Sequence, residues 1–353
     1  MRVSVCVPAF ERPEMLAQLM ESFAAQDHED RELCISDDSR TDAVERIVEE
    51  MKIPGVVYRR NAVNLGFAGN LRAALTMASG EVIVILGDDD LLASPAALST
   101  YGAAFEASPS AVFAYPNLVQ TDECLRVTLL YPHFKQDVVY RAGTEAVKNL
   151  LLRSILITGI GLRRTPSILE YFPTANMLFP QVELVGRLLA DGEGIGIGSF
   201  LCATRAHPEQ LGFEAIQGRG TKGGEQHGGI EVMEITRYLI RDNPSMHSVR
   251  PSIDRELSRA FTTNMVNEKC VTGNRAVVHN AYELVRNTRV TGATGLLILV
   301  CLATVLLPAR VALAIKEAVR SHVADRQIDR NGVDVGQLSE FWRRSSESEG
   351  PHT

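Results

Sequence analysis

Short apolar runs alternate with helically spaced apolar residues through the first third of the chain, and this order constrains the fold more than any other feature. Periodicity predicts helices at Met15–Phe23, Ala43–Met51 and Ala68–Ala78 and after Pro95, with Gly80 stopping the third helix. Buried strands are predicted at Val3–Val7, Leu33–Ser36, Val56–Arg59, Glu81–Leu86 and Ala111–Tyr115. Such βαβαβαβ order predicts an α/β fold with a mostly parallel sheet flanked by helices.

Three stretches that suit ligand binding, two of them acidic, follow predicted strands at the edge where open α/β sheets bind ligands. They are Pro8-Ala9-Phe10, Asp37-Asp38 and Asp88-Asp89-Asp90. The first strand is followed by no G-x-G-x-x-G, and the chain has no G-x-x-x-x-G-K-[ST]. The sequence therefore predicts a ligand site at this edge that is neither a dinucleotide fingerprint nor a P-loop.

Composition limits the class of protein. The 353 residues suit a domain of roughly 200–250 residues with an extension. With 45% hydrophobic and 22% charged residues the chain can form a packed core, and a net charge of −7 argues against nucleic acid as a partner. The N-terminal apolar run is too short for a signal peptide, and the six irregularly spaced cysteines predict free thiols and a cytoplasmic location.

The three consecutive aspartates Asp88-Asp89-Asp90 directly follow the apolar run VIVIL. Adjacent carboxylates repel one another unless they share a cation, and Mn²⁺ and Mg²⁺ prefer carboxylate oxygens. A metal held there would neutralise charge that develops on a diphosphate leaving group. The alternative is an acidic loop that caps the helix near Pro95.

Asp38 ends another predicted strand. Its carboxylate can accept a hydrogen bond from the ring N–H of a nucleobase, or it can cap the helix that starts near Thr41. Both roles are compatible.

Four stretches resemble glycosyltransferase family 2, which has the GT-A fold, and within it the abequosyltransferase-like branch. They are VSVCVPAFERPEML, CISDDSRTD, YRRNAVNLGFAGNLRAAL and SGEVIVILGDDDLL, and the likeness becomes diffuse after about residue 115. The resemblance implies a nucleotide-sugar donor site. It implies that Pro8, Ala9 and Phe10 lie against the base, with Arg12 in the same stretch, and that Asp38 binds the base. Asn64, Gly66 and Asn70 would lie beside the nucleotide. Asp88 and Asp89 would bind the donor, and Asp89 or Asp90 would bind Mn²⁺ or Mg²⁺.

The family's catalytic base is an acid that opens a helix with an arginine four residues later, and Glu183 with Arg187 fits this pattern. An inverting transfer needs such a carboxylate to take the acceptor's hydroxyl proton. The adjacent second acid is absent, since Gln181 and Val182 precede Glu183. Glu183 could instead be a solvated residue paired with Arg187.

Arg205 and His207 lie in a stretch that resembles the family's R-x-H-P-x-Q motif. The histidine would ligate the metal and the arginine would clamp phosphate, although a structural histidine is an equal alternative. Glycines crowd residues 213–229, which would form a mobile loop that closes over the donor or is simply disordered.

The expected organisation is a catalytic domain over 1–212, the loop over 213–229, a helical extension over 230–324 and a polar tail over 325–353. Residues 290–309 carry no charged side chain and have basic flanks. This segment suits a membrane hairpin or interfacial anchor, and the alternatives are a true span or a core or dimer helix. An anchor would hold the protein at the inner face of the cell membrane, near a lipid-linked acceptor.

The sequence thus predicts an inverting hexosyl- or deoxyhexosyltransferase for a saccharide or lipid-linked acceptor in surface-polysaccharide synthesis, with oligomerisation possible. A sugar nucleotidyltransferase shares the sheet order, but it needs a glycine-rich basic loop after the first strand and VPAFERP has no glycine. A catalytically inactive nucleotide-sugar-binding protein is the third hypothesis, because the acid beside Glu183 is missing.

Overall fold

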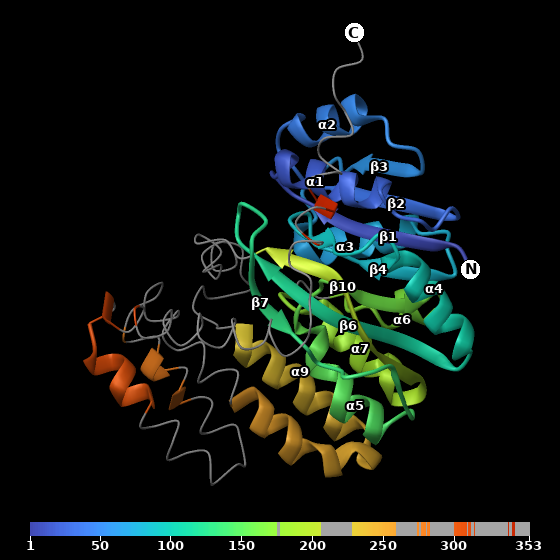
Figure 1. The fold of residues 1–353 in the computed structure, drawn as a ribbon. Helices are drawn as coiled ribbons and strands as arrows, with labels where there is room; N and C mark the ends of the chain where they lie inside the picture. Colours follow the sequence, from blue (N-terminus) through green and yellow to red (C-terminus); the bar gives the residue numbers. More distant parts are fainter. Residues whose placement is uncertain are drawn as a thin grey trace.

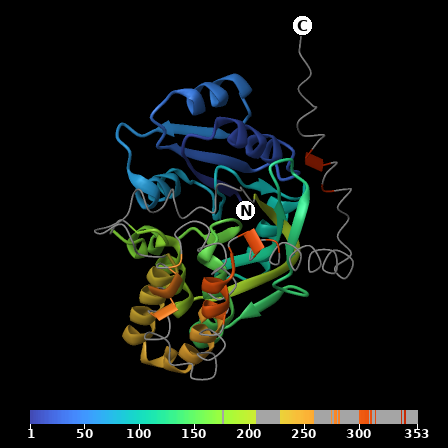
Figure 2. The same cartoon turned by 90° about the vertical axis from the view of Figure 1, so that its left-hand side faces the viewer.

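The computed structural model describes most of the N-terminal two thirds of the chain and separate parts of the remainder (Figures 1 and 2). The described residues are 1–174, 177–205, 228–258, 274, 277–279, 281–282, 300–308, 310–311, 314, 338 and 341–342.

Strands and helices alternate in the predicted order, as Figure 1 shows. The strands are β1 (Val3–Ala9), β2 (Arg31–Asp37), β3 (Val56–Arg60), β4 (Val82–Ile85), β5 (Leu91–Leu92), β6 (Ala111–Thr121), β7 (Val127–Tyr131), β8 (Val138–Tyr140), β9 (Ile160–Arg163) and β10 (Glu193–Arg205). The helices are α1 (Pro13–Ala24), α2 (Ala43–Met51), α3 (Gly66–Met77), α4 (Ala97–Ala107), α5 (Thr144–Leu150), α6 (Ser167–Tyr171), α7 (Pro180–Asp191) and α9 (Gly228–Asp242), with 3-10 helices η1 (Leu151–Ile155) and η2 (Pro244–Val249).

The sheet has the strand order β3-β2-β1-β4-β9-β6-β10-β5. Strands β3, β2, β1 and β4 are parallel, as are β6 and β10, which confirms the predicted βα alternation. Strand β9 is antiparallel to both β4 and β6 and lies between them, so the complete sheet is mixed. The five strands predicted from the sequence therefore do not form one continuous parallel block.

Helices cover both faces of the sheet, as the alternation of side chains along β1 shows. Val3 lies near Gly102 of α4, whereas the Cys6 thiol donates to the Ala74 carbonyl in α3. Side chains an odd number of residues apart point to opposite faces of a strand, so α4 and α3 pack on opposite faces. Strand β1 is completely buried between them.

Strand β10 contains three glycines at alternate positions, Gly194, Gly196 and Gly198, a composition that is typical of a turn. The strand instead runs from Glu193 and pairs with β6 and β8. A Cβ on Gly194 would lie 2.2 Å from Leu150 Cδ1, so its lack of a side chain makes room for α5. Gly80 likewise lies against the start of β1 and does not close α3, which ends at Met77.

The predicted helical extension resumes at α9, and its buried side chains join the main core. Part of the predicted polar tail also packs on the body. The Trp342 indole N–H donates to the Leu92 carbonyl at 3.0 Å, and its ring packs on Leu91, Val119 and Ala203. Within the residues that the structure describes, no helix has both the length and the apolar character needed to cross a membrane.

Trp342 is the only tryptophan in the chain, so its fluorescence reports whether this part of the tail is packed. We expect native emission at shorter wavelength than in denaturant and slow quenching by acrylamide, because the ring is 3% exposed. Emission and quenching equal to those of the denatured protein would contradict the packing. N-acetyltryptophanamide serves as the control for a fully solvated indole.

Candidate donor and metal site

The carboxyl ends of β1, β2 and β4 meet at one edge of the sheet, as the sequence predicts. The backbone N–H of Asp38 donates to the Ala9 carbonyl at 3.0 Å, and that of Leu86 donates to the Cys6 carbonyl at 3.2 Å. These bonds continue the parallel ladder to its last residues, so the three loops that follow start side by side. Pro8 and Ala9 are buried in β1, and Phe10, the next residue, is partly exposed at this edge.

The first two aspartates of the acid motif converge on one positive charge. Arg12 Nη1 donates to Asp88 Oδ1 at 2.9 Å and to Asp89 Oδ2 at 3.1 Å. Asp88 Oδ2 also accepts the Phe10 backbone N–H at 2.7 Å. The loop after β1 and the loop after β4 are thereby joined through carboxylates that are mostly out of water, with side chains 7% and 12% exposed.

Asp90 turns inward. Its Oδ2 accepts the Gly87 backbone N–H at 2.6 Å and the Thr158 hydroxyl at 2.7 Å. Burial, and then the charge of Asp89, raise the pKa of Asp90 to about 8 and that of Asp88 to about 7. Near neutral pH these two carboxyls therefore hold protons that an exposed aspartate would have released.

The donor set around the acid motif suits a hard divalent cation. Mg²⁺ and Mn²⁺ are commonly held by one or two carboxylates together with the phosphates of a substrate. Asp88 and Asp89 already direct oxygens at a single cationic group, the Arg12 guanidinium. Among the described residues no group of three or more His, Cys, Asp or Glu side chains is arranged to hold a metal. Asp90 as a ligand stays a prediction.

Asp38 organises the loop after β3. Its carboxylate accepts from the Asn61 side-chain amide at 2.8 Å and from the Leu65 backbone N–H at 2.9 Å, and its carbonyl accepts from Asn64 at 3.1 Å. Gly66, at φ +70°, opens α3 and donates its N–H to the Asn64 side-chain oxygen. Asp38 is thus buried and already holds two donors, which leaves base recognition as a prediction.

Asn70 extends this network to β1. Its amide nitrogen donates to the Ala9 carbonyl at 2.9 Å, and its oxygen accepts from Asn61 at 3.1 Å. Since Asn70 is 3% exposed, its contacts in the structure are with the protein. It therefore fixes the ends of β1 and β3 relative to each other.

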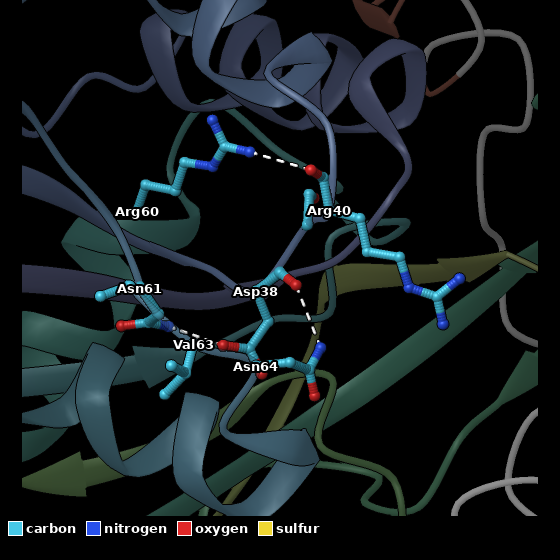
Figure 3. Close-up of a pocket in the computed structure, with 8 residues that line it drawn as sticks. Asp38, Arg40, Arg60, Asn61, Val63 and Asn64 are labelled. Carbon is cyan, nitrogen blue, oxygen red and sulfur yellow. Dashed lines mark hydrogen bonds between the residues drawn. The ribbon is translucent and has the colours of Figure 1, made fainter.

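A pocket of about 410 Å³ opens beside Asp38, as Figure 3 shows. It is lined by Asp38, Ser39, Arg40, Arg60, Asn61, Ala62, Val63 and Asn64. In the close-up the Arg60 guanidinium points to the Arg40 carbonyl, with 3.1 Å between the donor and the acceptor. In this pocket the guanidinium groups of Arg40 and Arg60 can bind an anion, and the buried carboxylate of Asp38 can accept a hydrogen bond from a ring N–H.

Glu183 lies in the first turn of α7 and is 8% exposed. Its Oε1 accepts from Arg187 Nε at 3.0 Å and from Arg187 Nη2 at 2.7 Å, so the pair proposed from the sequence is formed. Both bonds use Oε1, which leaves Oε2 outside the Arg187 contact. The Gln181 amide donates to the Ile155 carbonyl at 3.1 Å, three residues before Thr158, and so ties this turn to the segment that contacts Asp90.

Arg205 ends β10 near the acid motif. Burial lowers its pKa, while the charges of Asp89 and Asp90 act in the opposite direction. One terminal nitrogen donates to Gln18 at 2.6 Å, and its buried Nε has no partner among the described atoms. His207 and residues 213–227 of the predicted loop lie outside the described residues.

Sequence reasoning missed Asn61 and Thr158 as members of this site. Asn61 directly follows β3, and the rule that polar residues at carboxyl ends of parallel strands gather at one edge could have identified it. Thr158 reaches Asp90 from the approach to the antiparallel strand β9, which no local pattern indicated.

Known proteins match the part of the chain that carries the Asp38 and Asp88–Asp90 loops. The model of "Glycosyl transferase family 2" matches residues 4–164. The match to this family therefore covers slightly less than half of the chain. This region contains the loops after β1, β2 and β4, which carry Arg12, Asp38 and Asp88–Asp90. Glu183, Arg205 and α9 lie after it in the sequence.

Curated relatives resemble a limited part of this chain. The abequosyltransferase RfbV of Salmonella typhimurium is 39% identical over 109 residues, which are 29% of this chain and 32% of that protein. A Campylobacter jejuni protein named GalNAc(5)-diNAcBac-PP-undecaprenol beta-1,3-glucosyltransferase is 36% identical over 102 residues, 28% of this chain and 33% of its own. The match therefore spans about a third of the length of these relatives.

Solved structures of low sequence identity share the fold of the family 2 domain and its extension. Staphylococcus aureus TarS 1-349 in complex with UDP-GlcNAc superposes with a TM-score of 0.58 at 14% identity, covering 94% of this chain and 92% of that one. The mannosyltransferase PcManGT from Pyrobaculum calidifontis, in complex with GDP-Man and Mn²⁺, gives 0.52 at 17% identity, covering 98% and 86%. The likeness confirms the predicted GT-A fold.

The raised pKa values of Asp88 and Asp90 predict how stability depends on pH. The folded state holds protons that the unfolded state releases between about pH 4 and about pH 8, so stability falls as pH rises through that interval. In EDTA we expect the thermal midpoint to fall between pH 6 and pH 9, and Asp90→Asn to reduce this fall because an amide cannot titrate. The exposed Asp191→Asn is the control, and an unchanged slope in Asp90→Asn would contradict the assignment.

Proposed function

We propose that this protein is an inverting glycosyltransferase that uses a nucleotide-diphosphate sugar as donor and a saccharide or lipid-linked acceptor. The observation that carries the proposal is the convergence of Asp88 and Asp89 on one cationic group, at the edge of a family 2 domain. Similar folds are found in complexes with UDP-GlcNAc and with GDP-Man and Mn²⁺. The pocket beside Asp38 supplies room and polar groups for the nucleoside end of such a donor.

Each region of the site has a part in donor binding under this proposal. The base enters the pocket beside Asp38 and meets Phe10, while Asn64, Gly66 and Asn70 keep the pocket wall in shape. The diphosphate lies against Asp88, Asp89 and Arg12, and Arg205, whose pKa the charges of Asp89 and Asp90 act to raise, adds a second guanidinium. Asp89, with Asp90 or His207 as further candidate ligands, would hold Mn²⁺ or Mg²⁺, and such an ion would supply positive charge beside the departing diphosphate.

The acceptor hydroxyl attacks the anomeric carbon as the bond from that carbon to the diphosphate oxygen breaks. Glu183 takes the hydroxyl proton, and the nucleoside diphosphate leaves on the opposite face, so the anomeric configuration inverts. Arg187 holds Oε1 of Glu183, which fixes the carboxylate and directs Oε2 to the proton. A carboxylate that is only 8% exposed meets little competing water.

Measurement of donor turnover tests both the metal dependence of the transfer and the role of Glu183 as the base. With Mn²⁺ and a panel of nucleotide-sugars and acceptors, we expect release of nucleoside diphosphate that stops in EDTA. Glu183→Gln should lower kcat by about 10²–10⁴-fold, because the amide cannot accept the proton. Asp89→Ala should abolish metal-dependent transfer.

The exposed Glu170→Gln on α6 is the matched control and should behave as the wild type. An Asp89→Ala enzyme with full transfer activity, or equal turnover with and without divalent metal, would contradict the metal-assisted mechanism.

We further propose that residues 290–309 bring the protein to the inner face of the cell membrane. In the described part of this segment, Cys301 and Thr304 are buried against the body, while Leu302 and Leu306 are 55% and 80% exposed. Residues four apart share one face of a helix, so these leucines form an outward apolar strip. One curated relative is named for an undecaprenol-linked substrate, and an acceptor of that kind would be reached from such a surface.

Flotation with anionic lipid vesicles tests membrane binding. We expect the wild type to float with the vesicles, and Leu302→Ser with Leu306→Ser to remain in the soluble fraction, because burial of two leucines is lost. Val139→Ser, an exposed apolar residue on β8, is the control. Absence of the wild type from the vesicle fraction would overturn this assignment.

A further inference from the structure

We infer that helix α9, which follows the family-matched segment, positions Glu183 for proton transfer through Glu231 and Leu239. This inference rests on the proposed function, because Glu183 is the base in that mechanism. Helices α7 and α9 pack against each other in the structure, as Figure 1 shows. Three contacts between them act on the turns of α7 that carry Glu183 and Arg187.

The first contact is a cap supplied from another element. Glu231 Oε1 accepts the backbone N–H groups of Leu178 and Phe179, both at 2.8 Å. Phe179 is the N-cap residue of α7 and makes no capping hydrogen bond with its own side chain. A carboxylate there satisfies backbone donors and lies at the positive end of the helix dipole, so it fixes where α7 begins.

The Glu231 carboxylate is partly buried at the position where it accepts these two N–H groups. Burial raises its pKa, whereas the two N–H groups it accepts act to lower it. The carboxylate therefore depends on the start of α7 as much as the start of α7 depends on the carboxylate. Loss of either partner leaves partly buried polar groups without these hydrogen bonds.

The second contact is a close approach of the Leu239 side chain on α9 to the backbone of α7. A Cβ on Gly186 would lie 2.3 Å from Leu239 Cδ1, which is closer than any real contact. Gly186 directly precedes Arg187 in the Glu183-Leu-Val-Gly-Arg187 stretch. Leu239 thus packs directly on the backbone between the proposed base and its arginine.

The third contact adds a polar group beside the base. The Tyr238 hydroxyl is buried, and burial and then the Glu183 carboxylate raise its pKa, although no described atom meets hydrogen-bond geometry with it. Tyr238 therefore lies near the Glu183–Arg187 pair without a fixed partner. Since Tyr238 directly precedes Leu239 on α9, a shift of this helix would move the Tyr238 hydroxyl as well.

Kinetics of paired variants test the positioning role. We expect Glu231→Ala and Gly186→Ala to lower kcat by at least about tenfold, with donor KM within about twofold of the wild type, because donor groups lie on other loops. Glu231→Gln should restore most of kcat, since its carbonyl oxygen can still accept both N–H groups. Leu239→Val should rescue Gly186→Ala by removing the atom that meets the new Cβ.

Glu234→Ala, an exposed glutamate on the same helix, is the matched control. Hydrogen exchange gives a readout that needs no substrate: Glu231→Ala should speed exchange of the Leu178 and Phe179 amides by at least about tenfold, whereas Glu234→Ala should not. Unchanged exchange at these amides would overturn the role of Glu231.

The two proposals fail in different ways. If Glu183→Gln is inactive while Glu231→Ala and Gly186→Ala keep wild-type kcat, the positioning role is wrong and the proposed base stands. If Glu183→Gln keeps full activity, Glu183 is not the base. The positioning role is then also wrong, even if Glu231→Ala speeds exchange of the Leu178 and Phe179 amides. Loss of kcat in Gly186→Ala without rescue by Leu239→Val would also overturn the contribution of Leu239.

Discussion

Carboxylates gathered out of water at the end of a parallel sheet need a positive charge or protons among them, and this constraint shapes the whole site. Arg12 supplies the charge for Asp88 and Asp89, and retained protons lessen the repulsion from Asp88 and Asp90. The sheet enforces the crowding because β1 and β4 are hydrogen-bonded neighbours, so the loops that follow them start side by side. The closeness of Arg12 to Asp88 and Asp89 at this edge is thus a direct product of the strand order.

The two halves of the proposed chemistry are built by different means. The donor edge is held by hydrogen bonds among loops that follow adjacent strands, with Asp38, Asn61 and Asn70 as the central network. The proposed base stands on a helix, where it is fixed by Arg187 and by packing against α9. The 155–158 segment joins them, since Gln181 contacts one of its ends and Asp90 the other.

Local pattern was sufficient for the first third of the fold, because each predicted strand there is an apolar run bordered by polar residues. It was also sufficient to bring Phe10, Arg12, Asp38 and the acid motif to one edge. The position of β9 between β4 and β6 could not be predicted, because antiparallel insertion depends on pairing between residues far apart in sequence. The glycines of β10 suggested a turn for a similar reason: only the structure reveals that Leu150 fills the space of the missing side chain at Gly194. The inward turn of Asp90 depends on Thr158, which no spacing in the sequence connects to it.

Glu231 caps the start of α7 from outside the catalytic domain expected from the sequence, and this affects where the protein can be cut. A fragment cut at the boundary suggested by the sequence, near residue 212, would lack the partner of the Leu178 and Phe179 amides. It would also expose core surface that Val232, Ile235 and Leu239 cover. A fragment that keeps both sets of contacts must include α9, which ends at Asp242, so the segment matched by the family model and the helix that follows it share one core.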